Sequence, residues 1–106
     1  MVRNKTLRVK DYKSTLLNRL RDPEYAAGYL AEVLESETQE TFLIAVKNVL
    51  DARKANISTF SKKTGISRQT LYHALSKRGN PRLSTLNQIL KTAGLRITFD
   101  ITKKAA

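Results

Sequence analysis

Residues 57–76, ISTFSKKTGISRQTLYHALS, have the clearest structural pattern in the chain. They read as two short helices that cross at a tight turn. Gly65 stands where the chain must turn, because glycine adopts a positive φ without a steric penalty. Ser61 is the small residue expected at the crossing, where a bulky side chain would push the helices apart. The stretch predicts a helix-turn-helix, an arrangement that presents its second helix to the major groove of DNA.

The apolar residues of this stretch define its buried side, which we expect to comprise Phe60, Ile66, Leu71, Ala74 and Leu75. Ser67 stands where the second helix must begin, and its hydroxyl can cap the free amides of the first turn. We expect the two helices to span about 58–64 and 68–77. Gly79 then follows as a left-handed C-terminal cap.

The outward side of the second helix carries the predicted base-contacting residues Arg68, Gln69, Thr70 and His73. Gln69 can form paired hydrogen bonds with adenine, and Arg68 with guanine. Thr70 can touch a thymine methyl group. His73 can reach a base or a phosphate, or it is simply solvated; as the only histidine it cannot form a metal cluster. Tyr72 stays open between the core and a phosphate contact.

Predicted phosphate contacts surround the motif. The first helix opens with hydroxyl residues, and its free amides and positive dipole end suit an anion. The predicted set is Ser58, Thr59, Lys62, Lys63, Ser67, Lys77, Arg78, Asn80 and Arg82. A single exposed lysine is ordinary on a soluble protein, so the prediction depends on the group.

The distribution of charge points to the same end of the chain. The chain carries 20 Lys and Arg against 9 Asp and Glu, a net charge of +11, which favours a polyanionic partner. From Ile57 onward ten basic residues stand against one acidic residue, Asp100, so this half holds +9. The first 56 residues hold only the remaining +2. The basic half is therefore the half expected to meet phosphate.

An acidic stretch lies in the other half, with no basic residue between its ends. It contains Asp22, Glu24, Glu32, Glu35, Glu37 and Glu40. Their spacing is that of a solvated helix face and a loop, not of a catalytic acid and base pair. The stretch serves solubility, or it offers a surface to a basic protein partner.

Composition excludes several classes of protein. There is no cysteine, hence no disulfide or thiolate metal site, and no apolar run approaches the length of a membrane helix. No signal-peptide pattern follows the basic N-terminus, so we expect a cytoplasmic protein without a membrane partner. The chain has no Gly-rich phosphate loop, metal-ligand spacing or nucleophile motif. We expect no enzyme, no cofactor and no small-molecule substrate.

The remaining helices follow from apolar spacing and capping residues. One helix begins at about Asp11 and buries Tyr12, Leu16, Leu17 and Leu20. A second starts after Asp22-Pro23-Glu24, with a cap, a proline at the first position and an acid at the positive dipole end; its apolar stripe is Ala26, Tyr29, Leu30, Val33 and Leu34.

A third helix is expected over about 38–54, with Phe42, Leu43, Val46, Val49 and Leu50 facing inward. After a turn at Asn80-Pro81, Ser84 caps the last helix, which carries Leu86, Ile89, Leu90 and Ala93 on its inner side. Gly94 ends it.

The two ends of the chain alternate apolar and polar residues in the period of a strand. Residues 1–10 form a basic arm in which Thr6 to Lys10 alternate, and residues 95–101 alternate more clearly. A lone strand leaves its backbone unpaired, so the second segment needs a partner, within one chain or between two copies. Residues 11–106 make one domain, with the helix-turn-helix at 57–77.

Three segments, DPEYAAGYL, TGISRQTLYHALSKRGNPRLSTL and LKTAGLR, occur in the order and spacing of a known family. The chain resembles the probable addiction-module antidote (HigA-like) antitoxins, which have a lambda-repressor-like helix-turn-helix of the XRE type. The resemblance runs from about Asp11 to Thr98. It implies a mainly α fold, with a five-helix core, to which this chain adds an N-terminal helical extension and a short C-terminal β-strand.

The resemblance also implies a function. Antitoxins of this family form homodimers on palindromic double-stranded operator DNA, repress their own operon, and bind a small RelE-like ribonuclease toxin. The family's base-contacting positions fall on Arg68, Gln69, Thr70 and His73 of this chain. Because such a toxin binds RNA and is itself expected to be basic, Glu32, Glu35 and Glu37 become the candidate toxin-binding residues.

Three alternatives stay open. A stand-alone repressor of the same fold would have no toxin partner, and the neighbouring gene would distinguish it. A small basic ribonuclease, the toxin itself, would need acid, base or cation clusters in a cleft. An RNA-binding module would need aromatic stacking surfaces that this sequence lacks.

Overall fold

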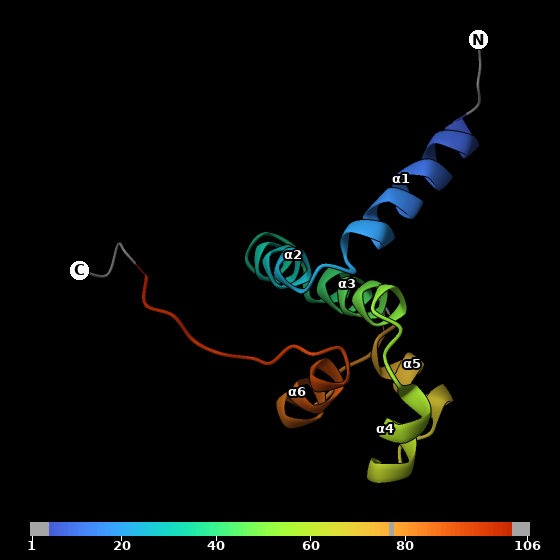
Figure 1. The fold of residues 1–106 in the computed structure, drawn as a ribbon. Helices are drawn as coiled ribbons and strands as arrows, with labels where there is room; N and C mark the ends of the chain where they lie inside the picture. The colour runs from blue at the N-terminus through green and yellow to red at the C-terminus, as the bar shows by residue number, and fades with distance from the viewer. Residues whose placement is uncertain (1–4, 77, 103–106) are drawn as a thin grey trace.

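The computed structural model describes residues 5–76 and 78–102, and the side chains from Tyr12 onward within those ranges. Six helices follow one another (Figure 1), and within the described ranges no residue belongs to a strand. The helices are α1 (Lys5–Arg19), α2 (Pro23–Ser36), α3 (Gln39–Ala52), α4 (Ile57–Thr64), α5 (Arg68–Ala74) and α6 (Leu83–Thr92).

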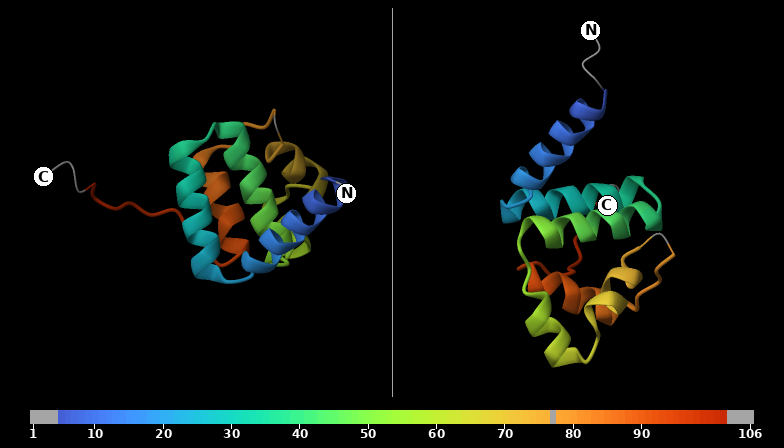
Figure 2. Two further views of the ribbon diagram at one scale, coloured as in Figure 1. Left: turned by 90° about the horizontal axis from the view of Figure 1, so that it is seen from above. Right: turned by 90° about the vertical axis from the view of Figure 1, so that its right-hand side faces the viewer.

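The helices form two layers around α3. The antiparallel pair α2 and α3 lies over α4, α5 and α6, while α1 stands out from the body (Figure 2). Helix α3 contacts α1, α2 and α6, and α4 contacts α5 and α6. The core between them is entirely apolar: its fully buried large side chains are Leu20, Leu43, Val46, Val49, Leu50, Leu71, Leu75 and Ile89. All the residues predicted to face inward from α3 are buried, which confirms that part of the sequence pattern.

Side-chain caps fix where the helices begin. Asp22 accepts a hydrogen bond from the amide of Glu24 (3.1 Å), and Thr38 accepts one from Thr41 (3.2 Å). Each cap satisfies one of the amides that a helix N-terminus leaves free. At the other end, α4 stops at Gly65, whose φ of +78° is accessible to glycine at little cost. The turn predicted at Gly65 is confirmed.

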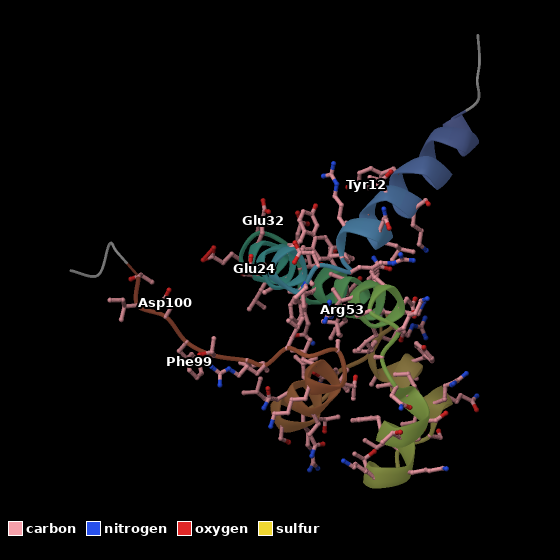
Figure 3. The ribbon with its side chains drawn as sticks, viewed as in Figure 1. Tyr12, Glu24, Glu32, Arg53, Phe99 and Asp100 are labelled. Carbon is pink, nitrogen blue, oxygen red and sulfur yellow. The ribbon has the colours of Figure 1, made fainter. Side chains whose placement is uncertain are left out.

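Arg53 forms two hydrogen bonds that join distant segments of the chain. The guanidinium of Arg53, just after α3, donates from Nε to the carbonyl of Ala93 (2.6 Å) and from Nη1 to the carbonyl of Arg21 (2.5 Å). The Ala93 carbonyl lies at the end of α6, and the Arg21 carbonyl lies in the turn after α1. Within the described residues, no other side chain links these two segments by hydrogen bonds. Arg53, labelled in Figure 3, therefore links the end of α3 to the turn after α1 and to the end of α6.

The prediction of a strand-like arm at Thr6 to Lys10 is wrong for the described residues from 5 onward. The backbone is helical from Lys5, so α1 starts six residues before the expected Asp11. A helix satisfies its own backbone, whereas a strand there would need a partner. Because α1 leaves the body, the side chain of Tyr12, expected on the apolar face of its helix, is 72% exposed. Leu34, the last residue of the apolar stripe expected on α2, is 63% exposed.

The expected C-terminal strand is not present in the single chain. Residues 95–102 run extended but pair with no strand in the described part of the molecule. The only proposed partner within the chain, Thr6 to Lys10, is helical and therefore not available for a ladder. The segment leaves the body beside α2 and α6 (Figure 1).

Two predictions about helix ends are also corrected. Helix α5 stops at Ala74, not at about 77, and Gly79 lacks a positive φ; it lies so close to the Ala74 carbonyl oxygen that an added Cβ would collide with it. Glycine is required there for close approach. Helix α6 begins at Leu83 with Arg82 as its cap residue, because the first helical hydrogen bond already runs from Leu86 to the carbonyl of Arg82. Ser84 lies inside the first turn and does not cap.

Candidate nucleic-acid interface

Helices α4 and α5, joined by the three residues 65–67, form the unit in which the sequence places DNA contacts. Phe60, Leu71 and Leu75 anchor the unit in the core at 5%, 1% and 0% exposure. Ser61, expected at the crossing, is half-buried, and within the described residues its hydroxyl has no hydrogen-bond partner. Its role as the small residue at the crossing stays a prediction.

Ser67 caps α5 as expected. Its Oγ accepts from the amide of Thr70 (3.1 Å), and its hydroxyl donates to Thr70 Oγ1 (2.9 Å). The two hydroxyls are therefore fixed against each other at the start of the helix. Ser67 is exposed, but its oxygen is already engaged in the cap, so it is a weaker candidate for a phosphate contact than its neighbours.

The four predicted base-contacting residues all lie on α5, and all are exposed. Arg68, Gln69 and Thr70 form its first turn, and His73 follows one turn later. None of the four makes an ion pair with another described residue. The fold thus brings these side chains together at the accessible end of one helix.

The predicted phosphate contacts gather around α5 from three segments. Ser58 and Thr59 lie in the first turn of α4, and Lys62 and Lys63 in its last turn; Arg78, Asn80 and Arg82 lie in the loop before α6. All seven are exposed. Lys77 lies outside the described residues. We call Lys62, Lys63, Arg68, Arg78 and Arg82 the basic surface.

Two of the polar candidates have partners. Asn56 caps α4 by accepting from the amide of Thr59 (3.0 Å), so that amide is occupied. Asn80 accepts from Gln39 Nε2 at 3.4 Å, a long contact to the start of α3. The amide group of Asn80 keeps its own donors for a phosphate oxygen.

An open hollow of about 460 Å³ lies beside this surface and adds residues that the sequence did not single out. It brings Ser58 of α4 and Arg68 of α5 together with Lys54, the end of α3 and Tyr72. Lys54 is the one non-glycine residue with a positive φ (+50°) among those described, so its backbone conformation is set by the fold and not by local preference. Only that three-dimensional proximity assigns Lys54 to the surface.

Tyr72, left open between two roles, is half-buried against α3. The ammonium nitrogen of Lys47 lies 5.6 Å from the centre of its ring, within the range of a cation–π contact. Its ring is therefore packed on the scaffold while one edge lines the hollow.

The acidic stretch forms a second surface, and one end of it, at Glu40, lies next to Gln39, which contacts Asn80 of the loop before α6. Glu24, Glu32 and Glu35 lie on α2, Glu37 follows its end, and Glu40 opens α3; all five are exposed, and we call them the acidic surface. The labelled Glu24 and Glu32 extend from α2 on the side away from α4 and α5 (Figure 3). Among the described residues, none of the five forms an ion pair.

The described residues contain no cluster of three His, Asp or Glu able to hold a metal ion. In the same part of the chain, no helix has both the length and the apolar character needed to cross a membrane.

Comparison with known proteins gives a consistent result. A family model described as "Probable addiction module antidote protein" matches residues 10–101. A protein of Haemophilus influenzae, described as uncharacterized, is 34% identical over 91 residues, which cover 86% of this chain and 90% of the relative. No solved structure matches the chain. The matched region includes all of α2 to α6 and most of α1, and the chain therefore belongs to the family of probable addiction module antidote proteins.

Proposed function

We propose that this protein is the antitoxin of a type II toxin–antitoxin module, which binds operator DNA to repress its own operon and neutralises a RelE-like ribonuclease toxin. Family membership supports the antitoxin role. The observation that carries the DNA-binding part is the exposure of Arg68, Gln69, Thr70 and His73 together on α5, with basic residues of α4 and the 78–82 loop on either side.

The proposed mechanism separates positioning from reading. Side chains of the basic surface neutralise phosphates and fix the register, but phosphates carry no base sequence. The first turn of α5 enters the major groove, where Gln69 reads adenine and Arg68 reads guanine. Two copies bind a palindromic operator, because each copy reads one half-site.

The toxin is proposed to bind the acidic surface. A ribonuclease that acts on RNA needs a basic surface, and opposite potentials raise its association rate with Glu32, Glu35 and Glu37. Because Glu24 and Glu32 extend from α2 on the side away from α4 and α5, a toxin bound there would leave α5 free for the operator (Figure 3).

The test of DNA binding uses the DNA upstream of the chain's own gene and random DNA of the same length. Gln69→Ala is expected to lose about tenfold to a hundredfold of the preference for the upstream DNA, since one paired base contact contributes about 1–3 kcal/mol. The matched control Lys62→Ala should weaken both DNAs equally. Undiminished preference in Gln69→Ala would place base reading elsewhere.

The toxin part is tested by co-expression with the product of the adjacent gene. Co-purification as a stable complex that suppresses RNA cleavage is expected. A chain that binds the upstream DNA but never the neighbouring product would instead be a stand-alone repressor.

A further inference from the structure

Residues 95–102 form an extended segment whose backbone is mostly unpaired. The amide of Leu95 donates to the carbonyl of Leu90 (3.0 Å), that of Ile97 to Asn87 Oδ1 (3.0 Å), and that of Ile101 to Oδ1 of its neighbour Asp100 (2.8 Å). The described part of the chain offers no partner to the amides of Arg96, Thr98 and Phe99. An unpaired extended backbone is a template for another strand.

Two apolar side chains of this segment are uncovered. Phe99 is 91% exposed and Ile101 88%, and Phe99 extends from the segment clear of the helices (Figure 3). An aromatic and a branched aliphatic side chain left this open on a small protein mark a contact surface.

A groove of about 340 Å³ lies beside the same segment. One wall is α2, with Ala27, Leu30, Ala31 and Leu34. The other is the segment itself, with the apolar Leu95 and Ile97 and also the polar Arg96 and Thr98. Phe42 and Leu90 also line it. The apolar groove and the two exposed apolar side chains are thus adjacent on one face of the molecule.

We propose that two copies of this chain pair residues 95–101 as antiparallel strands about a two-fold axis at Thr98, and that the resulting ribbon covers the groove of each copy. In this register Arg96 lies opposite Asp100 of the second copy, and Asp100 opposite its Arg96. Opposite charges directly across an antiparallel pair stabilise it.

The charges select this register among the possible ones. Registers that shift the pairing by one residue place apolar side chains opposite polar ones, because side chains alternate between the two faces. Registers that shift it by two residues leave Arg96 and Asp100 without each other. A parallel, in-register pair would place Arg96 against Arg96, which is repulsive.

The same register accounts for the exposed apolar residues. Phe99 of the second copy lies opposite Ile97, and its Ile101 lies opposite Leu95. Directly opposed residues share one face of a ribbon. Because Leu95 and Ile97 line the groove, the second copy's Phe99 and Ile101 are brought over it, next to Leu34.

This interface adds to the proposed function, because a palindromic operator requires two copies of the chain. In that one respect the proposal rests on the proposed function. Both tests use the full chain without DNA or toxin. Failure of the interface would therefore leave operator binding and toxin binding to be judged separately.

The first test is a disulfide cross-link. The chain is suited to it because it contains no native cysteine. Residues opposed on the axis have Cα atoms about 4.5–5.5 Å apart, which a disulfide can bridge. Thr98→Cys is expected to form a covalent dimer on mild oxidation. The control Thr102→Cys lies four residues from the axis, about 27 Å from its counterpart, and should not. Equal cross-linking of both variants, or of neither, would overturn the proposal.

The second test exchanges the charges and measures dimer dissociation by sedimentation equilibrium. Arg96→Asp and Asp100→Arg each create two like-charge pairs and should weaken the dimer about tenfold. The double variant restores opposite charges and should recover most of the affinity. A monomeric wild-type chain, or a double variant as weak as the two single effects combined, would contradict this interface.

Discussion

The basic surface and the acidic surface differ in how they are built. The basic surface draws its residues from α4, α5 and the loop before α6, so it exists only when α4 packs against α5 and α6. The acidic surface comes almost entirely from α2 and the residues that follow it. The first surface therefore depends on the tertiary fold, whereas the second is largely set by local sequence and helix periodicity.

The largest effect is expected when the charges of the basic surface are neutralised. Changing Lys62, Lys63, Arg78 and Arg82 to Gln should weaken operator binding about a hundredfold at low salt. The slope of log affinity against log salt should fall by about 0.9 for each phosphate that is no longer neutralised, measured by fluorescence titration. Lys13→Gln on α1 serves as the control. An unchanged slope would show that these residues do not bind phosphate.

Arg53 tests whether the two surfaces belong to one cooperative unit. Arg53→Met removes the hydrogen bonds to the carbonyls of Ala93 and Arg21, and we expect the free energy of unfolding to fall by about 2 kcal/mol. Urea denaturation followed by circular dichroism measures this. Lys91→Met, an exposed change on α6, should stay within about 0.5 kcal/mol of wild type. An equally small effect in Arg53→Met would mean that the layers are held by the core alone.

Charge reversal on the acidic surface should have a smaller effect. Glu32, Glu35 and Glu37 changed to Lys should slow association with the toxin several-fold at low salt, because complementary potentials act mainly on the association rate. Operator affinity should stay nearly unchanged. The variant with Gln at the same three positions should have an association rate between those of the wild type and the Lys variant. If surface plasmon resonance finds the same association rate for all three proteins, α1 or residues 95–102 become the next candidates.

The smallest effect is expected from Ser61→Ala at the predicted crossing of α4 and α5. Ser61→Ala removes a buried hydroxyl that has no partner among the described residues, so stability should rise by up to about 1 kcal/mol. Ser61→Leu should lower it by about 1–3 kcal/mol through overpacking. Thermal denaturation of the two variants separates size from polarity. A destabilised Ser61→Ala would indicate that the hydroxyl has a partner after all.

Most of the fold could be predicted because helices carry local signals. Asp22 and Ser67 cap the helices that the sequence assigns to them, and Gly65 ends α4 as expected. The buried stripe of α3 follows directly from apolar spacing. For the candidate site, the sequence identified the exposed residues of α5, but only the fold brings Lys54, which follows α3, to the hollow beside Arg68.

The errors arose where a local pattern depends on a partner. Alternation in Thr6 to Lys10 and in residues 95–101 suggested two strands, yet a strand is stable only when its backbone is paired. The first segment satisfies its backbone as part of α1. The second has neither a helical period nor a partner within the described chain, and stays extended. The assignment of a left-handed cap to Gly79 failed because glycine serves close approach there.

The hydrogen bonds of Arg53 restrict sequence change at position 53 more than at the positions of their acceptors. Both acceptors are main-chain carbonyls, of Arg21 and Ala93, which every amino acid supplies. Positions 21 and 93 can therefore drift without losing these bonds, while position 53 admits no other residue with the same two-pronged reach. Among relatives of this fold, we expect arginine to be kept at position 53 while the residue at position 21 varies. Both hydrogen bonds therefore depend on the identity of one side chain.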